Sequence, residues 1–249
     1  RTLPKIATQI ATCKTECSVV IDAERVREFL GKPRFRDEAR LRTETPGVAI
    51  GLAWTPAGGE VLFVEAKVME GEGGLILTGQ LGDVMKESAR IALSYAQGKL
   101  KEFGLPENAL DHKVVHLHVP AGAIPKDGPS AGVTLVTALI SELTRRPVRG
   151  DVGMTGEVTL QGQVLPIGGV KQKVLSAHRY GLKAVILPKA NEVDLDEVPQ
   201  EIRDELTFVL VAHLDKVLGV ALTPRVEFGA VSEPAGGSDG HFHLTPELA

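Results

Sequence analysis

The sequence predicts an α+β fold, in which β-hairpins and crossover helices follow one another along a chain of 249 residues. Two patterns lead to this prediction. Apolar residues alternate with small or polar ones over 48–54 and 61–68, and they recur at helical spacing over 83–103 and 130–146. With 43% apolar and 24% charged residues the composition is that of an ordinary globular protein, so a core of useful size is expected.

Charge, hydropathy and cysteine content narrow the classes of function. A formal net charge of -4 does not favour nucleic acid as a partner. No apolar run approaches the ~18 residues of a membrane span and no signal peptide opens the chain, which predicts a cytoplasmic protein. Cys13 and Cys17 lack a second Cys or His pair that would complete a zinc site, so we interpret them as ordinary core or surface residues.

The two ends of the chain differ from its middle. The apolar spacing over residues 1–31 predicts a small helical piece, which is too short to bury a core by itself. The chain does not begin with Met, which suggests a fragment of a longer protein. The charged segment 32–46 is typical of a linker, and the main domain is expected over 47–223. Residues 224–249, rich in Pro, Gly, Ser and His, predict a disordered tail.

Within the main domain the expected elements follow in order. A hairpin turns at Pro56-Ala57-Gly58-Gly59. Glu65 lies on the same side of the second hairpin strand as Val61 and Phe63, either at the solvent edge or facing a site. The remaining elements are a Gly-rich loop over 71–74, a helix over 83–103, a strand over 113–119, a helix over 130–146, strands over 152–159 and 163–167, a helix that follows Gly168-Gly169 and ends at about Tyr180, a strand over 184–187, an acidic helix, a strand over 207–211 and a short helix that ends near Leu222.

A single serine stands where a rigid loop enters a helix, in the segment Pro125-Lys126-Asp127-Gly128-Pro129-Ser130-Ala131-Gly132. Ser130 lies there beside the unpaired N–H groups at the positive end of the helix dipole, which suits a nucleophile whose oxyanion is held by main-chain donors. Pro129 has no N–H, so those donors would come from Ser130, Asp127 or Gly128. The alternative is that Ser130 only caps the helix.

A nucleophilic serine needs a base, and histidine is the first kind that the sequence offers. His116 and His118 share one face of the strand over 113–119, shortly before the loop. A histidine base also needs a carboxylate that orients the imidazole, and Asp127 and Glu65 are available for this role.

Lysine is the second kind of base, because burial lowers its pKa toward neutrality. Lys171 and Lys173 follow Gly168-Gly169 on a helix. Two residues are about 200° apart around a helix, so only one of the two lysines can face a given site. Spacing alone does not choose between them.

Several separated motifs make the sequence similar to one family. They are Pro125–Gly132, Met154-Thr155-Gly156-Glu157, Leu165-Pro166-Ile167-Gly168-Gly169, and Lys171-Gln172-Lys173 with Ala177-His178-Arg179. In this order they closely resemble the proteolytic domain of the bacterial Lon proteases, a family of ATP-dependent Ser-Lys peptidases. The resemblance covers roughly 47–222 and implies mixed β-sheets with packed helices. The residues before it resemble the end of the small α-helical subdomain of that family's AAA+ module.

The resemblance implies a role for particular residues. Ser130 matches the nucleophile and Lys173 the general base, which leaves Lys171 at the surface. Thr155 matches a threonine whose hydroxyl holds the lysine amine. The other matching positions are Asp127, Glu65, His116 and His118, with supporting or structural roles, and Asp127 is a hypothetical ion-pair partner of Lys173 in a resting state.

The resemblance also implies a setting for the domain. The family forms a homohexameric ring and degrades unfolded, damaged and regulatory proteins in quality control and stress response. No Gly-x-x-x-x-Gly-Lys-[Ser/Thr] phosphate loop occurs in this sequence, so ATP and Mg²⁺ are expected only for an upstream AAA+ module in the full-length protein. We expect no cofactor or metal in this chain.

Two other functions compete with the Ser-Lys peptidase. One is a Ser-His peptidase that uses His116 or His118. The other is an assembly domain without catalysis, in which Ser130 is a helix cap and Lys173 is exposed to solvent.

Overall fold

A computed structural model describes residues 43–55, 58–120 and 125–224 of the chain. The helical piece expected over 1–31, with Cys13 and Cys17, lies outside the described residues. So do most of the expected linker and all but the first residue of the expected tail. In the part of the chain that the structure describes, no helix is long and apolar enough to cross a membrane.

A seven-stranded mixed sheet runs through the molecule in the order β3-β4-β2-β1-β5-β8-β9. β1 pairs antiparallel with β2, and β2 with β4, whereas the other neighbours are parallel. This sheet and its packed helices confirm the α+β class. The strands are β1 (Val48–Thr55), β2 (Gly58–Glu70), β3 (Leu75–Thr78), β4 (Lys113–His118), β5 (Val152–Met154), β8 (Ala184–Pro188) and β9 (Thr207–Val211).

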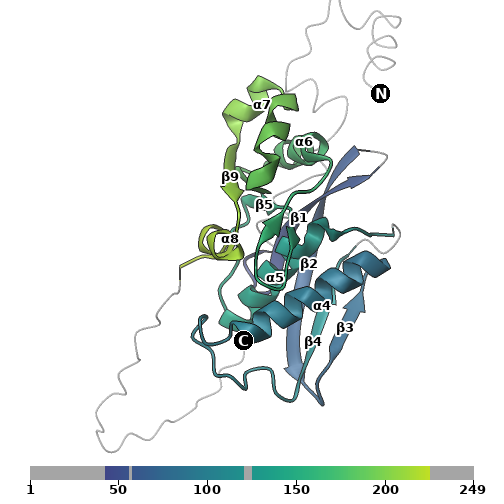
Figure 1. Ribbon diagram of the computed structural model, residues 1–249, viewed down its shortest axis with the longest axis vertical. Helices are drawn as coiled ribbons and strands as arrows, with labels where there is room; N and C mark the ends of the chain where they lie inside the picture. Colours follow the sequence, from purple (N-terminus) through teal and green to yellow (C-terminus); the bar gives the residue numbers. More distant parts are fainter. Residues whose placement is uncertain (1–42, 56–57, 121–124, 225–249) are drawn as a thin grey trace, which may run out of the picture.

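Helices cover both faces of the sheet (Figure 1). On one face, α4 and α5 pack with α8 on side chains such as Val64 and Leu117. On the other face, α6 packs on Ile50 and Phe63. The helices are α4 (Asp83–Gly98), η1 (Pro129–Ala131), α5 (Gly132–Thr144), α6 (Val170–Tyr180), η2 (Lys189–Glu197), α7 (Gln200–Glu205) and α8 (Leu214–Ala221), and a small second sheet pairs β6 (Glu157–Val158) with β7 (Val164–Leu165).

The patterning of α5 and α6 explains their places. Every residue from Gly132 to Glu142 is buried, as expected for a helix between α4 and the sheet. In α6 only one stripe is buried, and Val170, Val174 and Ala177 lie on it. The apolar spacing therefore fixes which face of each helix meets the core.

Some boundaries differ from the sequence-based expectation. β3 was not expected, because four residues are too few to show a periodicity. α4 ends at Gly98, and the chain continues to residue 104 in tight turns. The strand expected over 152–159 is divided into β5 and β6, because the N–H of Thr155 bonds to the Ile186 carbonyl and that of Gly156 to Ser130. The expected acidic helix is η2 followed by α7.

Candidate active site

Ser130 and Lys173 line the same cleft, which has a volume of about 600 Å³. Ser130 comes from η1 on one side of the sheet, and Lys173 comes from α6 on the other. Trp54, near the end of β1, lines the cleft between them. The two residues that the motifs single out are thus brought together from opposite faces of the sheet.

Main-chain contacts hold Ser130 in place. Its carbonyl accepts a hydrogen bond from the Gly156 N–H at 2.9 Å, and the Gly156 carbonyl in turn accepts from the Val133 N–H at 3.0 Å. The Thr155 hydroxyl donates to the same Ser130 carbonyl at 3.2 Å. The segment between β5 and β6 is therefore hydrogen-bonded to the start of α5, and it places Thr155 next to the serine.

Lys173 is a buried lysine on the apolar stripe of α6, with 2% of its surface exposed. Its Nζ donates to Thr155 Oγ1 at 3.0 Å. Within the described residues no carboxylate forms an ion pair with it. Burial, which disfavours the charged form, lowers the pKa of Lys173 from 10.5 to about 8. Lys171 is not among the buried residues of this helix.

The hydroxyl of Thr155 has a fixed direction. Because its proton is donated to the Ser130 carbonyl, Thr155 Oγ1 can only accept from Lys173. A neutral amine that donates one proton to Thr155 keeps its lone pair for another proton. Among the described residues no hydrogen bond joins Ser130 Oγ to Lys173, although both residues line the same cleft.

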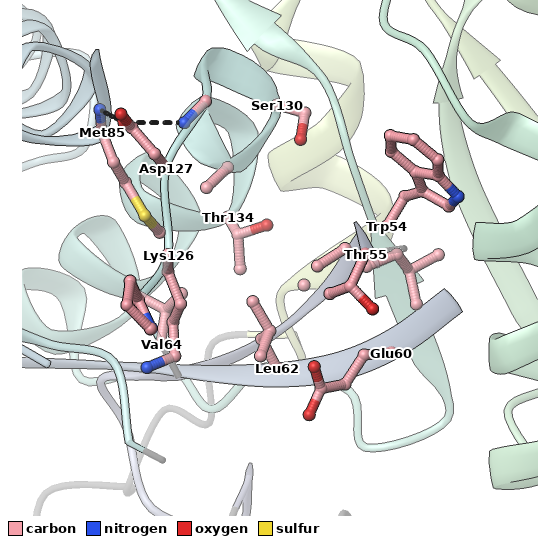
Figure 2. Close-up of a pocket in the computed structure, with 16 residues that line it drawn as sticks. Trp54, Thr55, Glu60, Leu62, Val64, Met85, Lys126, Asp127, Ser130 and Thr134 are labelled. Atoms are coloured by element: carbon pink, nitrogen blue, oxygen red, sulfur yellow. Dashed lines mark hydrogen bonds between the residues drawn. The ribbon is translucent and has the colours of Figure 1, made fainter. Parts of the chain in front are cut away.

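Asp127 caps helix α4 from a distant part of the chain. Gly82 at the N-cap position offers no side chain, and Asp127 Oδ1 accepts instead from the Met85 N–H at 3.0 Å (Figure 2). The same oxygen accepts from the Gly128 N–H at 2.8 Å. In this structure Asp127 is therefore not paired with Lys173, and of the predicted oxyanion donors the Gly128 N–H is already occupied.

A smaller pocket of about 80 Å³ opens beside Ser130 (Figure 2). Apolar side chains from β2 and α4 line it, including Leu62, Val64 and Met85. Lys126 also lines it; this lysine is only 8% exposed and its Nζ donates to the Gly79 carbonyl at 3.0 Å. Burial lowers the pKa of Lys126, although the charge of Glu60 opposes this.

Sequence reasoning assigned no role to Lys126 or Trp54. The only available signal for Lys126 was its place in the loop before Ser130. For Trp54 it was that this single tryptophan stands near the end of a strand, where it remains 55% exposed.

Glu65, His116 and His118 lie away from the cleft and the pocket. Glu65 of β2 is paired with His118 of β4, and their side chains alternate with the core residues that face α5. The two imidazoles bond to Thr78 of β3, with His116 Nε2 at 2.9 Å and His118 Nδ1 at 2.6 Å from its hydroxyl. The structure does not bring these residues to Ser130.

Comparisons with known proteins agree with the motifs. Residues 20–224 match the family described as Lon protease (S16) C-terminal proteolytic domain. The Lon protease of Dictyoglomus thermophilum is 54% identical over 218 residues, which are 88% of this chain and 28% of that protein. That of Salinispora arenicola is 57% identical over 226 residues, or 90% and 29%.

Lon protease 2 of Thermus thermophilus is 58% identical over 204 residues, which are 82% of this chain and 25% of that protein. The chain thus spans between a quarter and three tenths of the length of these relatives. The family match extends over most of this chain, including every described residue. The chain belongs to the family of Lon C-terminal proteolytic domains.

Proposed function

We propose that this chain is a serine endopeptidase with a Ser130–Lys173 dyad. One observation carries the proposal: a lysine with a pKa lowered to about 8 is buried in the cleft that Ser130 lines, and Thr155 orients its amine. At pH 7 a pKa of about 8 rather than 10.5 raises the neutral fraction of the lysine roughly 300-fold. A neutral amine is the form that can accept a proton.

In the proposed reaction Ser130 Oγ attacks the carbonyl carbon of the peptide bond and passes its proton to Lys173 Nζ. Lys173 then gives that proton to the leaving amine, so the C–N bond breaks and an ester to Ser130 remains. Water then attacks the ester carbonyl and loses a proton to Lys173, which passes it to Ser130 Oγ as the acyl C–O bond breaks and the carboxyl product leaves. Main-chain N–H groups at the loop before α5 are the donors for the oxyanion.

The free edge of β1 favours an extended substrate. β1 pairs with β5 only at Gly51, opposite Met154, so within the described part of the chain Ala53 and Trp54 have a neighbouring strand, β2, on one side only. Ala53 and Trp54, which form this free edge of β1, line the cleft. An extended peptide would pair with such an edge by main-chain hydrogen bonds. This supports unfolded chains as substrates, and the apolar pocket beside Ser130 favours an apolar side chain next to the cleaved bond.

The relatives' greater length supports a wider proposal. In a longer protein an upstream AAA+ module would bind ATP and Mg²⁺ and unfold damaged and regulatory proteins for this domain. The assembly would be a homohexamer in the cytoplasm, with no membrane partner and no role for nucleic acid through this fragment. These proposals rest on the family.

Hydrolysis of an unstructured fluorogenic peptide by the purified chain tests the dyad. Ser130→Ala and Lys173→Met should each reduce kcat/KM by a factor of 10³ or more. His116→Ala and His118→Ala should leave it within about threefold, because both imidazoles bond to Thr78 and lie away from Ser130. Loss of activity with either histidine variant would instead favour the Ser-His peptidase.

The assembly-domain alternative requires an exposed Lys173. The side chain is 2% exposed, and a buried lysine costs stability that a surface residue would not. A complete lack of peptide hydrolysis by the folded chain would revive this alternative.

A further inference from the structure

The loop between β7 and α6 forms one wall of the catalytic cleft. Pro166, Ile167, Gly168 and Gly169 all line the cleft. The wall closes against Trp54, because a Cβ added at Gly169 would lie 3.0 Å from the Cβ and Cγ of that tryptophan. It also begins the helix of the catalytic lysine, since the Gly169 carbonyl accepts from the Lys173 N–H at 3.0 Å.

A buried asparagine stands behind this wall. Asn191, at the start of η2, is 4% exposed and does not line the cleft. Its Oδ1 accepts from the Ile167 N–H at 3.0 Å, and its Nδ2 donates to the Ile167 carbonyl at 2.8 Å. The second proton of Nδ2 goes to Asp194 Oδ2 at 2.5 Å. One side chain thus binds both main-chain groups of Ile167, as a neighbouring strand would.

These contacts also fix how the amide is turned. With oxygen and nitrogen exchanged, Asn191 would place its oxygen against the Ile167 carbonyl and the Asp194 carboxylate, where no donor is present. The position therefore requires a residue with one acceptor and two donors. Aspartate, which has nearly the same shape, supplies only acceptors when ionised.

Peptide geometry carries the effect of Asn191 to the neighbouring residues. The N–H and C=O of a trans peptide point in opposite directions, and the described residues contain no cis bond. Binding of the Ile167 N–H by Asn191 therefore turns the Pro166 carbonyl away from Asn191. Binding of the Ile167 carbonyl turns the Gly168 N–H away in the same manner. Neither group has a protein partner among the described residues.

We propose that Asn191 is a positioning residue for substrate binding, which holds the Pro166 carbonyl and the Gly168 N–H toward the cleft so that they bind the main chain of an extended peptide. The substrate then lies between two backbones, the free edge of β1 and the wall formed by the loop. This inference rests on the proposed peptidase function, and it adds a second recognition edge and the residue that fixes it.

Substitution of Asn191 by aspartate tests the proposal with little change of volume. Asn191→Asp keeps the acceptor for the Ile167 N–H, loses the donor to the Ile167 carbonyl and places a second carboxylate beside Asp194. We expect kcat/KM for an unstructured peptide to fall at least tenfold, the order expected for one lost hydrogen bond and a misplaced wall. Asp194→Asn is the matched control, because it leaves both Ile167 bonds in place, and its kcat/KM should stay within threefold.

A small fluorophosphonate separates recognition from reactivity, since it reacts with the serine without needing a peptide backbone. Asn191→Asp should label Ser130 within threefold of the wild-type rate, because the contact of Lys173 with Thr155 is untouched. A parallel fall in labelling and peptide cleavage would overturn the proposal and make Asn191 a purely structural residue. Unchanged peptide cleavage would also overturn it.

Ester substitution in the substrate identifies the hydrogen bond itself. In a series of peptides, one amide at a time is replaced by an ester, which removes a single N–H donor. With the wild type, the ester at one position should raise KM about tenfold because the Pro166 carbonyl loses its donor. With Asn191→Asp that penalty should disappear, whereas the penalty for the β1 edge should persist. Equal penalties in both proteins would contradict the proposal. A wild-type chain that neither labels nor cleaves would instead defeat the proposed function.

Discussion

At the scale of single residues, Lys173 is distinguished from Lys171 by its place on α6. It shares the buried stripe with Val170, Val174 and Ala177, and it lies three, one and four residues from them in the chain. The spacing of Lys173 relative to these apolar residues was visible in the sequence. A charged residue is not expected on a buried stripe, however, so the family motifs identified Lys173 and the apolar periodicity did not. The partner of Asp127 could not be predicted, because Met85 is 42 residues away.

The pH dependence of peptide hydrolysis follows from the pKa of Lys173. Only the neutral amine accepts the serine proton, so kcat/KM should rise with pH, reach half its maximum near pH 8 and level off above it. Measurement of initial rates between pH 6 and 10 checks this. A half-maximum below pH 7, typical of a histidine base, would contradict it.

Lys173→Met should make the folded state more stable while abolishing hydrolysis. In the folded protein the pKa is lowered to about 8, so between that pH and 10.5 the unfolded chain binds more protons and stability rises with pH. Below pH 8 the full penalty of the buried charge is present, up to about 3 kcal/mol. Urea unfolding should show the largest gain for Lys173→Met near pH 7 and a smaller one at pH 10.5. A destabilised variant at pH 7 would disagree with this account.

At the scale of elements, helix α4 takes its cap from Asp127, in the loop before Ser130. A helix is usually capped by the side chain of the residue just before it, but Gly82 has no side chain. The Asp127 carboxylate fills this place, since a Cβ added at Gly82 would lie 2.2 Å from it. The position of α4 and that of the loop before Ser130 are therefore linked through one carboxylate. Gly128 has a φ of +111°, a backbone conformation that favours glycine, and it forms the turn that directly follows Asp127.

Asp127→Ala should remove the N-terminal cap of α4 and let the first turn of this helix fray. We expect a loss of about 1 kcal/mol in the free energy of unfolding, as for other helix caps, and faster hydrogen exchange of the Met85 amide. Asp127→Asn keeps an acceptor and loses only the favourable charge at the helix N-terminus, so it should cost less than Asp127→Ala. Equal losses in both variants would show that Asp127 Oδ1 does not cap this helix.

At the scale of the whole molecule, the sequence predicted the class of fold and most elements, since the apolar periodicity of long segments such as α4 and α5 is enough to predict a helix. It did not predict how the sheet is ordered or that β3 forms its edge, because strand pairing depends on contacts far apart in the chain. The cleft exists only because Ser130 and Lys173 approach from opposite faces of that sheet. No local pattern describes such an approach.

The arrangement of the cleft predicts a strong preference for unfolded substrates. A folded protein cannot offer an extended backbone to the free edge of β1, whereas an unfolded chain can. A small disulfide-bonded protein should therefore be cleaved at least 100-fold more slowly in its native form than after reduction and alkylation. Gel electrophoresis of timed digests measures this, and comparable rates would count against pairing with β1.

The most direct test of the Ser130–Lys173 dyad is intact-mass spectrometry after treatment with a fluorophosphonate at pH 9, where Lys173 is mostly neutral. A Ser130–Lys173 dyad predicts one adduct per chain, located on Ser130, absent from Ser130→Ala and formed at least 100-fold more slowly in Lys173→Met. No adduct on the folded wild-type chain, or labelling of Lys173→Met at the wild-type rate, would contradict it.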